Sequence, residues 1–412
     1  MTQGIDGRDG RDVEDRAVTA LAAVETRKRA AAPREGAPPA GVGPARLDSL
    51  TGLRFFAALA VFVCHSSFLL IGSASLVLPT FADQGANTAF ADATGQLGAL
   101  GVGFFFVLSG FVLTWSARAT DRIGSFYRRR FVKILPLYYV AGIAATVLLW
   151  DLGVRWRDLL AYAGLVQVWV PNPEVNFSVL TPGWSLAVEA AFYLVFPLVI
   201  RWFRGLGTRA AWTGLALCVA AAFLIPILAY VLPAGTGELV GAPNETGFET
   251  WFAYVLPLGR LCDFFAGVFA ALLVTSGRFP RVSMPWVLLS FVPCYVVAIN
   301  SPWLFGQRAP LLISCVLLIV AAAQRDIARR PTFLSSSTMV LLGNVSFAFY
   351  LCHHLVLYTL NVKVMHGPFD SVAMVIAYMA SALVVSVALA WLLHRYVEMP
   401  IVRRFSTARK RR

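Results

Sequence analysis

Residues 53–71 read LRFFAALAVFVCHSSFLLI, an apolar run that contains two ionisable residues, Arg54 and His65. A run of about 20 apolar residues has the length needed to cross a bilayer. Because a backbone in lipid must satisfy its own hydrogen bonds, such a run forms a helix. The chain as a whole agrees, since 58% of its 412 residues are hydrophobic, 14% are charged and its mean hydropathy is +0.69. A soluble domain carries about a quarter charged residues, so we expect a membrane protein.

Further apolar runs of spanning length follow this first one along the chain. Together they predict helices near 53–71, 98–117, 131–150, 184–203, 211–232, 251–274, 284–300, 308–323, 339–360 and 372–393. The seventh and eighth runs are the shortest, and the run 159–170 is too short to cross, so we expect it at a membrane interface. The expected fold is an all-α polytopic membrane protein with about ten transmembrane helices.

The two ends of the chain differ in composition from the membrane domain, which we place at 47–400. Residues 1–46 are rich in Ala, Gly, Pro and charged residues and contain no aromatic residue. Such a segment buries too little apolar surface to offset its ordering entropy, so we expect a disordered cytosolic leader. It contains no apolar stretch of the signal-peptide type. Residues 401–412 end in RKRR and are expected to form a basic cytosolic tail.

The formal net charge of +13 is distributed unevenly over the predicted connections. Basic residues concentrate in the two ends and in alternate connections, the richest of which holds Arg118, Arg122, Arg128, Arg129, Arg130 and Lys133. The other connections carry only Arg155, Arg157, Arg308 and Lys363. The positive-inside rule then predicts an even number of helices with both termini cytosolic. No nucleic-acid fold signature accompanies the charge, so we expect anionic lipid as its partner and no nucleic acid.

Several classes of site have no signal in the sequence. The six cysteines are scattered through apolar runs, without a CxxC pair and without zinc spacing, so we expect neither disulfides nor a metal. No Walker motif is present, which argues against an ATP-driven pump.

Ionisable residues inside spans are costly and by default suggest a functional site. Those that lie deep within the predicted spans are His65, Glu189, Arg260, Asp263, His353 and His354. We place His65, Glu189 and His353 in the outer half of the membrane, which is weak evidence for a shared cavity. Arg260 and Asp263 are three residues apart on one helix face, where they can simply neutralise each other.

Arg54 and His65 face the same way along the first predicted helix. Eleven residues correspond to about three turns, so the two side chains are separated by about 16 Å along the axis. A cation at one end can hold an anion, and a histidine deeper in can act as a general base at neutral pH. This spacing suits a cofactor with phosphates at one end and a reactive group on a long arm, such as a coenzyme A thioester. The competing interpretation is that Arg54 is a positive-inside anchor and His65 a hydrogen-bonded core histidine.

Seven stretches of the chain resemble the acyltransferase-3 family, the integral membrane O-acyltransferases of bacteria. They are LDSLTGLRFFAALAVFVCHSSF (47–68), GVGFFFVLSGFVL (101–113), FYRRRFVKILPLYYV (126–140), TPGWSLAVEAAFYLVFPL (181–198), GRLCDFFAGVFAALL (259–273), LGNVSFAFYLCHHLV (342–356) and RYVEMP (395–400). The motifs occur in the family's order and cover most of the chain, and we expect the standalone form of the family, without an appended soluble domain. The first helix also resembles that of antibiotic acyltransferases that modify macrolides.

The resemblance implies an acetyl or short acyl group carried by acyl-CoA as co-substrate, with no permanently bound cofactor. His65 would be the catalytic base, assisted by Glu189 or His353. Arg54, Arg129, Arg130 and Lys133 would contact the donor. Candidate contacts for the substrate or the tetrahedral oxyanion are Trp184, Ser185, Tyr193 and Arg260. The acceptor would be a hydroxyl of a macrolide or of a cell-surface or exported glycan.

The chain departs from the family pattern at three positions. Lys133 replaces the second Arg of an Arg-x-x-Arg pattern, which keeps the charge but loses the bidentate fork. Ala190 replaces a second acid, so a mechanism with two carboxylates is in doubt, and Cys352 stands where an aromatic residue commonly precedes the histidine. Two other functions remain open, namely a proton-coupled transporter that uses the buried His, Glu and Arg residues, and a non-catalytic scaffold or sensor.

Overall fold

The computed structural model describes residues 46–71, 76–118, 121–232, 238–239 and 242–406, within a compact unit that extends from Ala45 to Arg412. The predicted leader lies outside the described residues except for Arg46, and so does the end of the predicted tail, from residue 407. Within the described part the chain is almost entirely helical.

A long helix coincides with each of the ten apolar runs. These helices are α2 (Asp48–Ser67), α3 (Gln84–Ser116), α4 (Ile123–Leu149), α7 (Gly183–Phe203), α8 (Thr208–Val231), α10 (Pro257–Thr275), α11 (Met284–Asn300), α13 (Ala309–Ile327), α14 (Ser337–Tyr358) and α15 (Val372–Leu393). Among the described residues, nine helical segments are long and apolar enough to cross a membrane, and α11, with 17 residues, is shorter. The eighth run, expected to be insecure, belongs to a continuous segment of 25 residues, Trp303–Ile327. The chain is therefore an all-α polytopic membrane protein.

Short elements extend or connect the long helices. Turns of π-helix precede α10 (Trp251–Val255) and follow α14 (Thr359–Val364) and α15 (His394–Glu398), and α16 (Met399–Phe405) continues from the last of these. The remaining helical pieces are α5 (Trp156–Ala163), α6 (Pro173–Asn176), α9 (Gly247–Thr250), α12 (Trp303–Gly306) and single 3₁₀ turns at Trp150–Leu152, Gln167–Trp169 and Phe333–Ser335. The run 159–170, judged too short to span, is thus divided between α5 and a 3₁₀ turn.

The first span was predicted too long at its end, because the helix stops at Ser67. Residues Phe68–Ile71 form strand β1, which pairs antiparallel with β2 (Leu76–Pro79). A second small hairpin pairs β3 (Glu238–Leu239) with β4 (Ala242–Thr246). The Ser66 and Ser67 hydroxyls bond back to carbonyls of the last helical turn, which favours termination there. A short apolar run does not by itself distinguish strand from helix, so hydropathy placed these four residues in the helix.

Helix α3 begins fourteen residues earlier than the apolar run predicted, at Gln84. Asp83 caps it by accepting a hydrogen bond from the Ala86 amide at 2.7 Å. The added turns are polar, which is why hydropathy did not detect them. Helix α4 likewise begins at Ile123, eight residues before the predicted span, and includes the basic segment that carries Arg130 and Lys133.

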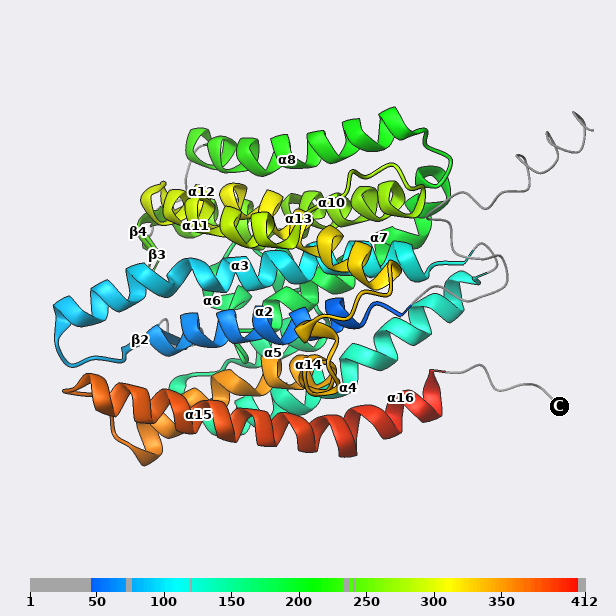
Figure 1. The fold of residues 1–412 in the computed structure, drawn as a ribbon. Helices are drawn as coiled ribbons and strands as arrows, with labels where there is room; N and C mark the ends of the chain where they lie inside the picture. The colour runs from blue at the N-terminus through cyan, green and yellow to red at the C-terminus, as the bar shows by residue number, and fades with distance from the viewer. Residues whose placement is uncertain (1–45, 72–75, 119–120, 233–237, 240–241, 407–412) are drawn as a thin grey trace, which may run out of the picture. The chain divides into compact units, whose positions relative to one another are not determined.

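Helices α2 and α3 form the centre of the bundle. Figure 1 shows them between α8, α10 and α13 on one side and α4, α14 and α15 on the other. Helices α3 and α10 approach closely at two glycines, since a Cβ on Gly110 would collide with the Phe264 carbonyl and one on Gly267 with the Val107 carbonyl. Small residues at helix contacts are typical of membrane bundles. This packing fixes α2, α3 and α14 around the residues considered next.

Candidate active site

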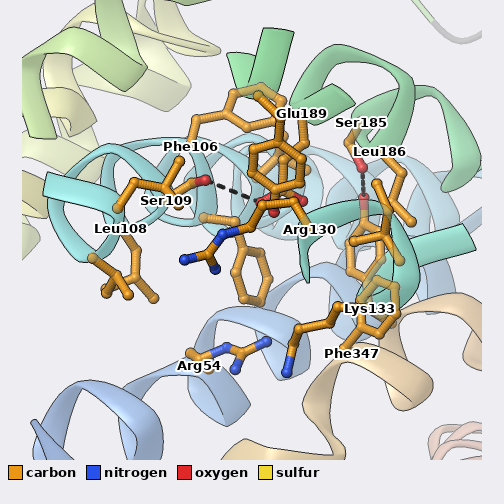
Figure 2. Close-up of a pocket in the computed structure, with 17 residues that line it drawn as sticks. Arg54, Phe106, Leu108, Ser109, Arg130, Lys133, Ser185, Leu186, Glu189 and Phe347 are labelled. Carbon is orange, nitrogen blue, oxygen red and sulfur yellow. Dashed lines mark hydrogen bonds between the residues drawn. The ribbon is translucent and has the colours of Figure 1, made fainter. Parts of the chain in front are cut away.

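A cavity of about 160 Å³ lies between α2, α3, α4, α7 and α14, and we call it the central cavity (Figure 2). Its lining residues are Arg54, Val102, Phe105, Phe106, Leu108, Ser109, Val112, Leu113, Arg130, Lys133, Ile134, Ser185, Leu186, Glu189, Tyr193, Phe347 and Tyr350. Three of the four predicted donor-binding cations, one from the first predicted span and two from the basic segment before the third, thus line one space.

The cations in the central cavity differ in their partners. The Lys133 ammonium lies 3.5 Å from Glu398 Oε1, and Glu398 also accepts from His394 Nδ1 at 2.8 Å. Among the described residues, neither Arg54 nor Arg130 takes part in an ion pair, and Arg130 Nε is buried without a hydrogen-bond partner. Two guanidinium groups are therefore available to an anion. The RYVEMP motif contains Glu398, but its contact with Lys133 was not predicted, because the two residues lie on different helices.

Glu189 is held in the central cavity by two hydroxyl groups. Ser109 Oγ donates to Glu189 Oε1 at 3.0 Å, and Tyr193 donates to the same oxygen at 2.7 Å. Both hydroxyl groups are donors here, and the carboxyl oxygen accepts from both. Figure 2 shows this carboxylate on the same side of the cavity as the Arg130 side chain. Ser109 was not predicted, because its contact with Glu189 joins helices α3 and α7.

Tyr350 and Ser185 form another part of the cavity wall. Their hydroxyl oxygens are 2.8 Å apart, and Ser185 Oγ donates to the Pro182 carbonyl at 3.0 Å. Since that hydroxyl has one proton, Tyr350 is the donor to Ser185. The Tyr350 ring also approaches the ring of His353, with 5.9 Å between centroids. Tyr350 therefore connects the central cavity with the histidines.

His65 and His353 are hydrogen-bonded to each other. His65 Nδ1 lies 2.9 Å from His353 Nε2, and His353 Nδ1 lies 3.1 Å from the Phe349 carbonyl oxygen. A carbonyl can only accept, so the hydrogen-bond network assigns the proton of His353 to Nδ1 and makes its Nε2 an acceptor. His65 then donates from Nδ1, which leaves its Nε2 with a free lone pair. The ring of His354 stands edge-on to His65 at 5.3 Å.

The structure brings together two of the three residues predicted to share a cavity and places the third elsewhere. It brings His65 and His353 into direct contact, while Glu189 lies with Ser109 and Tyr193 among the lining residues of the central cavity. Tyr193 directs its hydroxyl at Glu189. Ser185 is the predicted oxyanion donor that lies beside Tyr350 and thus nearer to the histidine pair.

Arg260 belongs to a buried charge cluster and is not among the residues that line the central cavity. Its Nη1 lies 3.0 Å from Asp263 Oδ2, and the Arg308 guanidinium lies 3.5 Å from Asp263 Oδ1. The Arg260 guanidinium also stacks 4.4 Å from the Tyr254 ring, and the residue is only 1% exposed. The expected neutralisation of Arg260 by Asp263 is present, with Arg308 as a partner that the sequence did not indicate. Trp184 is likewise buried in packing, 4.9 Å from Tyr254 between ring centroids.

Arg129 points to a neighbouring surface pocket. It pairs with Asp121 at 3.1 Å, and the two line this pocket together with Arg118 and Arg130. Arg130 lines both spaces, so the surface pocket and the central cavity adjoin. In the described part of the chain no group of three or more His, Cys, Asp or Glu residues could hold a metal ion, and the six cysteines are free.

Comparison with known proteins places most of the chain in one family. A family described as an acyltransferase domain matches residues 47–395. Acyltransferase MdmB from Streptomyces mycarofaciens is 38% identical over 372 residues, which cover 87% of this chain and 92% of that protein. O-acetyltransferase OatA from Staphylococcus aureus is 23% identical over 385 residues, which cover 87% of this chain and 57% of that protein. No solved structure matches the chain.

Proposed function

Since this chain belongs to the acyltransferase-3 family and is a multi-pass membrane O-acyltransferase, we propose that it transfers an acetyl or short acyl group from acyl-CoA to a hydroxyl of a sugar-containing acceptor. The observation that carries the proposal is the hydrogen bond between His65 and His353, beside a cavity lined by cations. His65 is the general base in this reaction.

The charges of the central cavity support acyl-CoA as the donor. Arg54, Arg130 and Lys133 would meet its phosphates, with Arg129 at the adjoining surface pocket. Arg54 and His65 lie on one helix, about 16 Å apart along its axis, so a phosphate end and a reacting end can be held on the same side of α2. Lys133 contributes a point charge, which attracts phosphate without a bidentate fork.

The size of the central cavity limits what it can hold. Its volume is about 160 Å³. An engineered protein cavity of about 150 Å³ holds one benzene molecule, whereas sites for drug-sized ligands measure about 300–1,000 Å³. The space therefore suits part of the flexible arm of the donor, and a macrolide or glycan would have to reach His65 from elsewhere.

The proposed reaction is a direct transfer without an acyl-enzyme. His65 Nε2 takes the proton of the acceptor hydroxyl, and the acceptor oxygen attacks the thioester carbonyl carbon. The carbon–sulfur bond then breaks, and the CoA sulfur leaves with the proton that His65 Nε2 took up. The products are an O-acyl ester and free CoA. Positioning of two bound substrates supplies the remainder of the rate enhancement.

His353 would position the base, because its Nε2 accepts from His65 Nδ1 and keeps the opposite nitrogen free. This resembles the role of the carboxylate in a serine-protease triad, with an imidazole anchored on a backbone carbonyl in its place. Tyr350, whose ring approaches His353, and Ser185 beside it are the candidate donors to the developing oxyanion, and each would have to exchange its present acceptor for that oxyanion.

The proposed acceptor is a macrolide-type antibiotic or a cell-surface or exported glycan. The resemblance of the first helix to antibiotic acyltransferases supports the former, and the similarity to an O-acetyltransferase supports hydroxyl acylation in either case. The bacterial relatives and the alternation of basic residues support a plasma-membrane location with both termini cytosolic.

The test uses membranes that contain the full chain, supplied with labelled acetyl-CoA and a panel of macrolides and polysaccharides. We expect label in one acceptor class with stoichiometric release of CoA, and loss of transfer in His65→Ala. Transfer at the wild-type rate by that variant would refute the role of His65. Uptake of a solute without consumption of CoA would favour the proton-coupled transporter instead.

A further inference from the structure

We infer that Glu189 binds the arm of the donor, accepting a hydrogen bond from an amide N–H of its pantetheine segment, and takes no part in proton transfer. The inference rests on the proposed function, since it requires an acyl-CoA donor. It identifies the chemical group that Glu189 would bind, namely a neutral amide in the flexible arm that carries the thioester.

The position of Glu189 along α7 suits this role. Ser185 precedes it by one helical turn, about 6 Å along the axis, and lies where Tyr350 approaches His353. Glu189 itself lines the cavity together with the cations Arg54 and Arg130. A donor with its phosphates on the cations and its thioester near the histidine pair must pass this carboxylate, which then faces the arm.

The hydrogen bonds of Glu189 leave one oxygen for a ligand. Ser109 and Tyr193 both donate to Oε1, at 3.0 and 2.7 Å. Glu189 takes part in no ion pair among the described residues, and it is a partly exposed lining residue of the cavity. Both printed bonds end on Oε1, so we assign Oε2 to the ligand. A carboxylate oxygen can only accept, so the group that it binds must be a donor such as N–H or O–H.

The charge of Glu189 also determines which part of the donor can bind next to it. A phosphate placed against this carboxylate would be repelled, whereas an amide N–H gains a charge-assisted hydrogen bond. The anion thereby excludes phosphates from its part of the cavity and leaves them to Arg54, Arg130 and Lys133. The base His65 has its own partner in His353, so Glu189 is not needed to orient it.

Two ligands separate the arm from the phosphates. CoA carries both, and adenosine 3′,5′-bisphosphate carries phosphates of the nucleotide without the pantetheine arm. With the purified full chain in detergent, we expect Glu189→Gln to weaken binding of CoA about ten- to a hundredfold, the range for a hydrogen bond to a charged group. Its affinity for the bisphosphate should stay within about twofold. Lys133→Ala should weaken both ligands, and Glu174→Gln, a change outside the cavity, should affect neither.

Each outcome separates this inference from the proposed function. Failure of the wild-type chain to bind either ligand would refute acyl-CoA as donor. Binding of CoA by Glu189→Gln with the wild-type affinity would refute the inference and leave the donor intact. A fall in kcat of a hundredfold with an unchanged KM for the donor would make Glu189 a catalytic acid or base, and would also overturn it.

Two further variants cover the case in which Glu189→Gln does not fold. Ser109→Ala and Tyr193→Phe each remove one hydroxyl that holds Oε1 and leave the carboxylate in place. We expect each variant to bind CoA several-fold more weakly and to bind the bisphosphate as the wild type does. Unaltered CoA affinity in both variants would overturn the inference.

Discussion

His65 Nδ1 and His353 Nε2 lie 2.9 Å apart and join helix α2 to helix α14. The two residues are 288 positions apart in the chain, and their ring planes are nearly parallel, with 8° between them. Because His353 is anchored on the Phe349 carbonyl, its free nitrogen can only accept. The donor and acceptor roles in the pair are therefore fixed. His65 donates to His353, His353 donates to the Phe349 carbonyl, and His65 Nε2 retains a lone pair.

The first prediction concerns these roles. His353→Ala removes the acceptor that orients His65, so kcat should fall on the order of ten- to a hundredfold, less than the 10²–10⁴-fold expected for loss of the general base itself. The KM for the acyl donor should change little. His353→Gln, whose amide oxygen can accept from His65, should recover part of the rate, and equal kcat values for the Ala and Gln variants would argue against an orienting role.

The second prediction concerns the cations at the central cavity. Arg130→Ala combined with Lys133→Ala should raise the KM for acyl-CoA at least tenfold, because two charges that would meet phosphate are removed. The KM for the acceptor should be unaffected. Arg128→Ala is the matched control, since Arg128 is exposed on the same helix and lines neither the central cavity nor the surface pocket. A change confined to the acceptor KM would show that these residues do not hold the donor.

The third prediction tests the buried cluster around Asp263. Asp263→Ala would leave Arg260 and Arg308 buried without a counter-ion, and breaking a buried pair in this way typically costs about 3–5 kcal/mol. We expect a lower thermal midpoint in detergent while the donor KM of the remaining folded enzyme is unchanged. If Asp263→Ala left stability intact and altered the KM for the acceptor, Arg260 would bind substrate as the sequence suggested.

The fourth prediction concerns the contact between α3 and α10. Gly110→Ala would place a methyl group against the Phe264 carbonyl, and overpacking of this kind costs about 1–3 kcal/mol. Gly103→Ala on the same helix is the control, because its added Cβ would meet nothing within 4 Å. Thermal unfolding of the two variants in the same detergent should separate them, and equal midpoints would mean that the helices adjust without cost.

The helices were predictable from the sequence because lipid imposes a strong and local rule on composition. Apolar length alone located a helix at each of the ten runs. It failed at Phe68–Ile71, where the apolar residues form a strand, and at the start of α3, where the helix is polar. In both places the local composition does not report whether protein or lipid surrounds the backbone.

Residues on one helix could be related to each other, but residues on different helices could not. The common face of Arg54 and His65 follows from helical geometry. The bonds from Ser109 to Glu189 and from Tyr350 to Ser185 depend on which helices are neighbours, and a single sequence does not specify this. For the same reason Glu189 was grouped with His65, although it shares its space with the cations.

The contact between Glu398 and Lys133 depends on the rotation of the helix at the π-helical turn His394–Glu398. This turn ends at Glu398, which is 2% exposed and reaches both His394 and Lys133. Each residue turns a helix by about 100°, so removing one residue such as Val397 would rotate Glu398 away from Lys133. Whether the charge of Lys133 is neutralised by Glu398 therefore depends on the rotation of a helical segment that does not itself line the cavity.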